Sequence, residues 1–487
     1  MSLARGAWLH LAAVALARVA ATGAALASGF RAVSDDDFAR VVIAEQWARA
    51  PRWDASGTSW LPAPFWLDGA AMMGLGRSLG AARAASLLLG VTASVLVYVA
   101  ARWLGEERGA AMAGAGIAAM FSWSALLGVA TVPELPTAAL TLLGIAALGA
   151  TDEKDTRRLW GAAALVAATL ARYEAWPVAA VFAAICAVDA ARRRSGRAAA
   201  AAALALLGPA AWMAWNRVAH QDALHFLARV SAYKHALGGA EDGAAARLLA
   251  YPTAMVREEP SLLALAVLAA ALVARREGGA GLRGALSRYA RPAAVIAAQI
   301  AALSLAMVKD GAPTHHPERA LLTAWLLVAV CGGALAVRGT RPRALGWVVL
   351  AGLTLLPALA VRLGHPDERF AARRDEEAAG RAAAALARPG EPVLVEVADY
   401  GYLAVIAALG RPEDAVPDRS IDPREPRVAS SFADPVALER RVAASGARWV
   451  VARAATPAGA VLGGPVAVRG AWAVFSPPRE PGERPAP

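Results

Sequence analysis

The sequence predicts a mainly α-helical protein that spans a membrane about 11 times and carries a small α/β domain near its C-terminal end. Apolar residues make up 57% of the 487-residue chain. Apolar runs of about 20 residues, the length that crosses a bilayer, recur through the first three quarters of the sequence. After Val361 the chain becomes charged, proline-containing and only intermittently apolar. This pattern argues against a soluble enzyme.

The expected spans follow the apolar runs in order. The first is expected to remain in the protein, because Arg18 interrupts it, it is longer than a signal-peptide core, and aspartates follow it without a convincing cleavage site. Several of the others are short and need support from neighbouring helices. The spans are predicted at residues 7–29, 81–103, 109–130, 135–150, 158–171, 175–191, 198–215, 260–274, 291–308, 320–337 and 344–361.

Basic residues crowd into short connections between these runs, which predicts that those loops are cytoplasmic. They lie at Lys154 to Arg158, Arg192 to Arg197, Arg275 to Arg291 and Arg338 to Arg343. The formal net charge of +11 is then explained by loops that face anionic membrane lipids. Nucleic-acid binding is not expected, because no basic surface interleaved with aromatic residues is evident.

The domain organisation follows from the change in composition. Residues 1–361 are expected to form the transmembrane domain, with a long first outer loop at 30–80. Because the N-terminus is expected inside and the number of expected spans is odd, residues 362–476 are expected outside. They are expected to form an α/β domain in which strands alternate with helices that end at Gly410 and Gly446. Residues 477–487 are expected to be disordered.

The two cysteines, Cys186 and Cys331, both lie in expected spans. Neither a disulfide framework nor a thiolate metal site is therefore supported.

Three adjacent aspartates, Asp35, Asp36 and Asp37, follow the first span. Such carboxylates repel one another at a low-dielectric boundary, so at least one is expected to have a raised proton affinity unless a cation or a network of sugar hydroxyls compensates. The cluster is suited to supplying a general base or metal ligands. The alternative is an ordinary helix N-terminus, because Ser34 and the aspartates precede a stretch without glycine or proline at residues 38–50.

The same loop is rich in aromatic residues between prolines: Trp53, Trp60, Phe65 and Trp66. Aromatic belts anchor membrane proteins at the headgroup layer. A loop in that layer is also suited to gripping the isoprenoid part of a lipid.

Further charged residues lie at the expected outer ends of later spans, where charges are costly unless they are paired. Glu134 lies between Pro133 and Pro136, and Arg172 and Glu174 lie in another outer turn. Cations that a phosphate or pyrophosphate leaving group requires are present in the segment KDGAPTHHPER, namely Lys309, His315, His316 and Arg319.

Together these features resemble the GT-C superfamily of polytopic glycosyltransferases, and in particular the bacterial protein-mannosyltransferase and aminoarabinose-transferase branch. The resemblance rests on the acidic cluster after the first span, the long aromatic loop, the outer glutamate, the segments RYEAWP and HHPER, and the C-terminal outer domain. The family's first-loop signature is Asp followed by Asp or Glu, so the triple aspartate leaves its register open. The WWDYG-type motif of oligosaccharyltransferases is absent from the sequence.

The resemblance implies an enzyme of the bacterial inner membrane that moves a hexosyl or pentosyl group from a polyprenyl-phosphate donor to an extracytoplasmic protein, glycan or lipid. Transfer in a single step would invert the anomeric centre. An aspartate among Asp35, Asp36 and Asp37 would be the base, with Asp36 preferred. The donor would be bound by residues among Arg172, Glu174, Lys309, His315, His316 and Arg319.

In this reading Glu134 positions the acceptor or, with Asp35 and Asp36, completes a site for Mg²⁺ or Mn²⁺, which prefer oxygen ligands. The metal requirement stays open.

A transporter or lipid flippase is the alternative, and it predicts ionisable residues near the middle of the bilayer. Apart from Arg18, the charges concentrate at span ends, which favours an enzyme. An inactive scaffold for envelope enzymes is a third hypothesis, although the charged residues expected of an active protein are all present.

Overall fold

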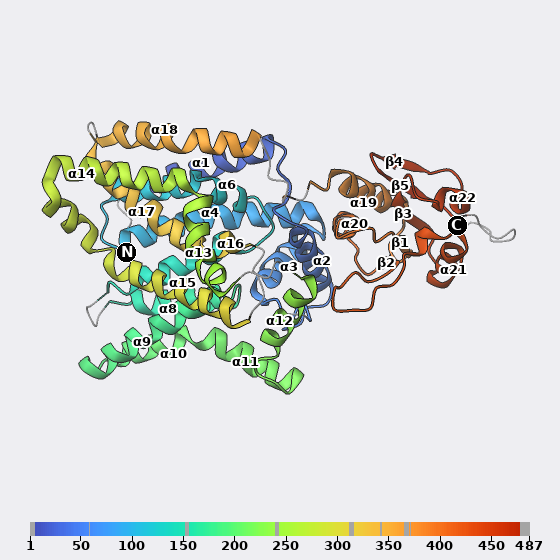
Figure 1. Ribbon diagram of the computed structural model, residues 1–487, viewed down its shortest axis with the longest axis horizontal. Coiled ribbons are helices and arrows are strands. Elements are labelled where there is room, and N and C mark those ends of the chain that lie inside the picture. Colours follow the sequence, from blue (N-terminus) through green and yellow to red (C-terminus); the bar gives the residue numbers. More distant parts are fainter. Residues whose placement is uncertain are drawn as a thin grey trace. The chain divides into compact units, whose positions relative to one another are not determined.

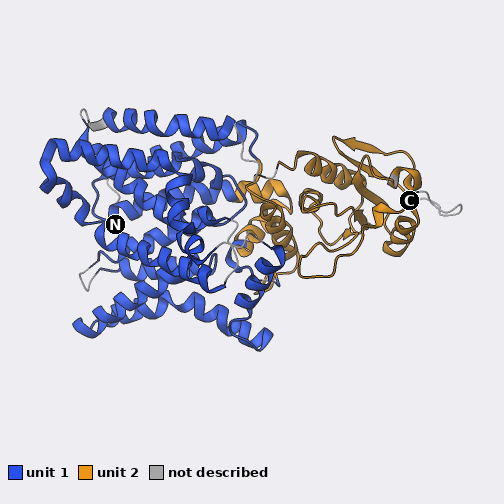
Figure 2. Ribbon diagram, in the orientation of Figure 1, with its two compact units in different colours: residues 1–30, 57–64, 86–367 blue, residues 31–56, 65–85, 368–487 orange. Residues whose placement is uncertain are grey.

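The computed structural model describes residues 5–57, 59–150, 155–238, 243–310, 316–340, 343–364, 370 and 372–477. The chain divides into two compact units, coloured separately in Figure 2. Unit 1 contains residues 1–30, 57–64 and 86–367, and unit 2 contains residues 31–56, 65–85 and 368–487. Four features named above lie outside the described residues: Lys154, His315, Arg341 and the expected disordered tail from residue 478 onward.

Unit 1 is built from helices (Figure 1). Among the described residues, six helices are long and apolar enough to cross a membrane: α1 (Arg5–Ala27), α4 (Leu79–Trp103), α9 (Ala175–Arg193), α15 (Ala290–Asp310), α17 (Leu322–Gly339) and α18 (Arg343–Gly364). The first residues of α4, up to Ala85, belong to unit 2. The bent pair α10 (Gly196–Ala205) and α11 (Leu207–His220) makes a seventh span if it crosses as one.

The described helices thus give six or seven candidate spans, fewer than the sequence predicted. One predicted span, at 109–130, is broken at Phe121. The backbone of Phe121 is extended, with φ −68° and ψ 150°, and it separates α5 (Arg108–Met120) from α6 (Ser122–Leu127).

The other differences also have simple physical causes. Two predicted spans are the short helices α7 (Glu134–Ala147) and α8 (Arg157–Thr169). Helices of 14 and 13 residues are about 20 Å long, whereas the hydrocarbon core is roughly 30 Å thick. The predicted span at 260–274 lies within α14 (Pro260–Ser287), and the interruption of this helix at Gly278, where φ is 72°, comes after that span.

Small residues allow the helices of unit 1 to pack closely. A Cβ atom on Gly333 of α17 would lie 2.4 Å from the backbone nitrogen of Gly114 on α5. A Cβ atom on Gly161 of α8 would lie 2.4 Å from the Cβ of Ala147 on α7. The remaining helices of unit 1 are α12 (His225–Leu237), α13 (Ala244–Glu258) and α16 (Pro317–Ala320).

Arg18 lies buried in α1, 1% exposed. Its guanidinium donates to the hydroxyl of Ser94 at 2.9 Å, and to the carbonyl and hydroxyl oxygens of Ser124 at 2.6 Å each. Ser94 belongs to α4 and Ser124 to α6. The charge that the sequence places inside a span is therefore satisfied by hydrogen bonds that join three helices.

Unit 2 combines the first predicted outer loop with the C-terminal segment (Figure 2). The loop contributes α2 (Asp36–Arg49) and most of α3 (Ala63–Leu75). The C-terminal segment contributes α19 (Arg374–Leu386), α20 (Tyr402–Leu409), the 3-10 helix η1 (Ser431–Ala433), α21 (Pro435–Ser445) and α22 (Ala458–Leu462).

Five strands of the C-terminal segment form one sheet in the order β2-β1-β3-β5-β4. They are β1 (Val393–Val395), β2 (Ala415–Pro417), β3 (Trp449–Arg453), β4 (Ala467–Arg469) and β5 (Trp472–Phe475). β1 pairs in parallel with β2 and β3, whereas β5 is antiparallel to β3 and β4. The predicted α/β character of this segment is confirmed.

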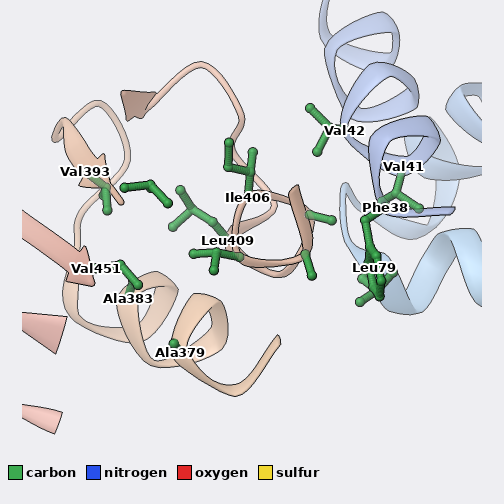
Figure 3. Close-up of a cluster of buried hydrophobic side chains, with 14 of the residues drawn as sticks. Phe38, Val41, Val42, Leu79, Ala379, Ala383, Val393, Ile406, Leu409 and Val451 are labelled. Carbon is green, nitrogen blue, oxygen red and sulfur yellow. The ribbon is translucent and has the colours of Figure 1, made fainter. Parts of the chain in front are cut away.

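A single hydrophobic cluster explains why the loop and the C-terminal segment form one unit (Figure 3). Phe38 and Val41 of α2 belong to the same buried cluster as Ile406 and Leu409 of α20. We expected the loop at 30–80 to belong with residues 1–361. Most of it is instead grouped with the C-terminal segment, because α2 carries apolar side chains that are buried in this cluster.

Candidate functional site

Three of the charged residues singled out in the sequence meet in unit 1. Glu134 is the first residue of α7 and is 1% exposed. Its Oε1 accepts hydrogen bonds from Nη1 of Arg172 at 2.6 Å and from Nε and Nη2 of Arg319 at 2.6 and 2.5 Å. Two guanidinium groups therefore converge on one carboxylate oxygen, which holds both cations at the same point.

The connection between α8 and α9 orients Arg172. Glu174, the N-cap residue of α9, accepts a hydrogen bond from Nε of Arg172. The amide of Gln299 on α15 donates to the backbone oxygen of Glu174 at 2.9 Å, which fixes this turn. Burial alone would lower the pKa of Arg172, but Glu134 and Glu174 outweigh it and raise that pKa, so Arg172 stays charged.

The remaining residues of the predicted cationic segment do not all join this cluster. Nδ1 of His316 lies 3.2 Å from Oε1 of Glu318, a buried residue next to Arg319. Lys309 is exposed near the end of α15 and forms no ion pair with any residue in the described ranges. His315 lies outside those ranges.

An aromatic group that sequence reasoning missed supports the Arg172 turn. Tyr173 stacks on Phe226 of α12, with ring centroids 4.9 Å apart and planes 6° from parallel. Its hydroxyl donates to the backbone oxygen of Ser59 at 2.7 Å and accepts from the indole nitrogen of Trp212 at 3.1 Å. The segment RYEAWP could have indicated part of this aromatic group, since it contains both Tyr173 and Trp176, whose rings pack edge-on.

A second charged group missed by sequence reasoning surrounds Trp123 of α6. Its backbone nitrogen donates to Glu259 at 2.7 Å and its indole to Glu258 at 3.3 Å. The guanidinium of Arg362 lies 5.1 Å from the centre of its ring. These contacts tie the short helix α6 to the start of α14 and the end of α18.

In unit 2 the three adjacent aspartates have three different environments. Asp35 forms a two-pronged ion pair with Arg373, in which both N–H···O distances are 2.9 Å. Oδ2 of Asp37 accepts hydrogen bonds from the backbone nitrogens of Val33 and Ser34 at 3.2 Å each. Asp36 lies between them as the first residue of α2 and is half-buried.

Asp36 and Asp37 lie in the first turn of α2, as the alternative of an ordinary helix N-terminus expects. Asp35 occupies the N-cap position, yet its side chain makes no capping hydrogen bond. Asp37 instead satisfies backbone nitrogens that precede the helix. Hydrogen bonds to Asp35 raise the pKa of Arg373 above its ordinary value, so this cation is charged at every physiological pH.

The aromatic residues of the first loop that belong to unit 2 pack with one another. The rings of Trp53 and Trp66 lie 4.8 Å apart, and the indole of Trp66 donates to the backbone oxygen of Trp53 at 3.1 Å. Phe65 is fully buried beneath the guanidinium of Arg40, 5.6 Å from the centre of its ring.

Two further carboxylates are buried in unit 2, and no sequence motif marked them. Glu45 of α2 is 0% exposed, and neither of its carboxylate oxygens has a hydrogen-bond partner in the described part of the chain. Burial raises its pKa to about 9, against the opposing effect of Arg77. Burial likewise raises the pKa of Asp68 to about 7, against the opposing effect of Arg40.

The residues considered for a metal do not fit one as they stand. Both oxygens of Asp35 are taken by Arg373, and Oε1 of Glu134 receives three N–H groups of arginine. Within the described ranges, no three His, Cys, Asp or Glu side chains are grouped to hold a metal ion. We derive no chemical step through a metal.

No protein-family model matches the chain. No curated protein matches it either. Solved structures are similar to it in fold. ArnT from Cupriavidus metallidurans in the apo state matches with a TM-score of 0.60 and 14% identity, over 95% of this chain and 97% of that one.

The structure of ArnT from Cupriavidus metallidurans bound to undecaprenyl phosphate matches with a TM-score of 0.59 and 13% identity, over 97% of this chain and 98% of that one. Archaeal oligosaccharyltransferase AglB from Archaeoglobus fulgidus, in complex with an inhibitory peptide and a dolichol-phosphate, matches with a TM-score of 0.50 and 12% identity, over 92% of this chain and 69% of that one. The chain is therefore an integral membrane protein that shares its fold with ArnT from Cupriavidus metallidurans.

Proposed function

We propose that the chain is an inverting membrane glycosyltransferase that moves a sugar from a polyprenyl-phosphate donor to an acceptor on the extracytoplasmic face. The observation that carries this proposal is the convergence of Arg172 and Arg319 on Glu134 in unit 1. The fold shared with ArnT supports it, as does the binding of undecaprenyl phosphate and dolichol-phosphate by the similar structures. The acceptor class, whether protein, glycan or lipid, stays open.

The arginines are suited to the donor phosphate. Arg172 uses Nη1 and Nε for Glu134 and Glu174, whereas its Nη2 has no partner in the described part of the chain. Its side chain as a whole is 19% exposed. Negative charge grows on the phosphate as the sugar leaves, and fixed cations stabilise that charge most in a site that excludes water. Glu134 keeps the two guanidinium groups oriented before the donor arrives.

The base is assigned to Asp36. Both oxygens of Asp35 are occupied by Arg373, and Asp37 accepts two backbone hydrogen bonds. Asp36 is preferred because it is the middle acid of the cluster and is flanked by an acid at either register of the Asp-Asp signature. In the proposed step the acceptor hydroxyl loses its proton to Asp36 and its oxygen bonds to the anomeric carbon. The bond from that carbon to the phosphate oxygen breaks, and the lipid phosphate departs with the electron pair.

The proposal is tested with the purified full-length protein in lipid nanodiscs. Undecaprenyl-phosphate donors carrying different hexoses and pentoses are supplied with candidate acceptors, and released undecaprenyl phosphate is measured. We expect release from at least one donor, with inverted stereochemistry in the product. Absence of release from every donor, by protein that remains folded, would count against the proposal.

A further inference from the structure

Arg373 is the centre of an ion-pair network that joins three separate segments of unit 2. Besides the two-pronged pair with Asp35, its Nη1 lies 3.2 Å from Glu376 of α19 and 3.1 Å from Asp399, which follows β1. The Arg373 side chain is 22% exposed. Two-pronged pairs between arginine and carboxylate are geometrically specific as well as strong. The network therefore defines where Asp35 lies, in addition to neutralising it.

A glycine makes room for this network. A Cβ atom on Gly401 would lie 2.7 Å from Nη1 of Arg373 and 2.8 Å from Oδ1 of Asp399. The backbone of Gly401 has φ −60° and ψ −20°, values that any residue adopts. A side chain at position 401 would therefore displace the ends of the Arg373 and Asp399 side chains, although the backbone there suits any residue.

The first turn of α2 is held from both sides. Asp35 is fastened to Arg373, and Asp37 is fastened to the backbone nitrogens of Val33 and Ser34. Asp36 lies between these two anchors in the sequence. Its backbone position consequently depends on Arg373, a residue 338 positions from Asp35 in the chain.

We infer that Arg373 is a positioning residue for transfer, through which the C-terminal segment holds the loop that carries the base. The inference rests on the proposed function, in which Asp36 is that base. A displacement of about 1 Å at a catalytic group costs roughly a hundredfold in rate. Loss of Arg373 should therefore lower kcat by about ten- to a hundredfold and leave the KM for the lipid donor nearly unchanged.

The test compares matched variants of the full-length protein. Arg373→Ala and Arg373→Lys remove the two-pronged ion pair with Asp35, and Gly401→Ala displaces the guanidinium group of Arg373. Arg453→Ala is the control for the charged network, because Arg453 contacts the other oxygen of Asp399, at 3.0 Å, and is half exposed. Gly459→Ala is the control for the glycine, because a Cβ atom there meets nothing within 4 Å.

Two readouts are taken. Hydrogen–deuterium exchange of the backbone amides at residues 33–39 reports whether the segment is held, and undecaprenyl phosphate release gives kcat and KM. We expect faster exchange and lower kcat in the Arg373 and Gly401 variants, and wild-type behaviour in both controls.

The outcomes that would overturn the role of Arg373 differ from the outcome that would overturn the proposed function. Unchanged exchange at residues 33–39 in Arg373→Ala overturns the inference, whatever the activity. Faster exchange with wild-type kcat also overturns it, because the segment then moves without affecting chemistry. If the wild-type protein releases no lipid phosphate from any donor, the proposed function fails and the role of Arg373 in transfer fails with it.

Discussion

Raising the pH should loosen unit 2, with the largest contribution from Glu45. Its side chain is fully buried, and burial raises its pKa from 4.5 to about 9. Below pH 4.5 the folded and unfolded states both hold the proton. Between pH 4.5 and 9 only the folded state holds it, so folding becomes less favourable as the pH rises through this window. Above pH 9 the penalty is complete.

The size of the effect follows from the shift. The interval between 4.5 and about 9, at 1.36 kcal/mol per pH unit, corresponds to a loss of at most about 6 kcal/mol of folding free energy. Arg77, which favours the charged form, is already included in that pKa. Even half of this value is a large share of the stability of a typical domain. Glu45→Gln keeps the shape of the side chain but cannot ionise. The folding free energy of this variant should therefore not show this loss as the pH rises.

The assay is the apparent stability of unit 2 at pH 5, 7 and 9, from the exchange rates of amides in α2 and α20. The wild-type protein should lose protection with rising pH, and Glu45→Gln should lose much less. Glu439→Gln, which alters an exposed glutamate of α21, is the matched control and should follow the wild type. Parallel pH profiles of the wild type and Glu45→Gln would refute the reasoning, because Asp68 and all other groups are common to both proteins.

Three further outcomes are expected. Arg172→Ala and Arg319→Ala should each lower donor turnover by about a hundred- to a thousandfold, and lysine at the same positions should restore part of it. Wild-type donor kinetics in both alanine variants would show that these residues do not bind the donor phosphate. Cysteine labelling of intact cells should reach Asp36→Cys from outside and Arg192→Cys only after permeabilisation, and the reverse pattern would overturn the assignment of the outer face. Arg18→Leu should lower stability by about 1–3 kcal/mol, because the hydroxyls of Ser94 and Ser124 lose their donor, and unchanged thermal unfolding would contradict a structural role for Arg18.

The fold could be predicted from the sequence where one local signal sufficed. Long apolar helices such as α9 and α17 are evident from composition, and α21 is evident from Asp434, whose side chain caps it, and from Gly446 after its last residue. The short helices α7 and α8 were predicted as spans that need support from neighbouring helices, and each is too short to span alone. The length of an apolar run in the sequence does not show where the helix ends against its neighbours.

Some residues of the candidate site were likewise marked by a signal in the sequence, and others were not. Glu134, Arg172 and Arg319 stood out because charges at span ends need partners, and they are indeed partners of one another. Arg373 did not stand out, because its partner Asp35 lies 338 residues away and no local pattern connects them. Glu45 was missed for a different reason, since a glutamate side chain is normally solvent-exposed. Only the packing of α2 shows that it is buried.

The most direct test of the account is the turnover of Asp36→Asn with the best polyprenyl-phosphate donor. Asparagine keeps the shape and hydrogen-bonding capacity of the side chain but removes the proton acceptor. The account predicts that release of lipid phosphate falls by roughly a hundredfold or more, that donor affinity is nearly unchanged, and that exchange at residues 33–39 stays at the wild-type level. Full activity of a folded variant with asparagine at Asp35, Asp36 and Asp37 together would contradict it and return the cluster to a purely structural role.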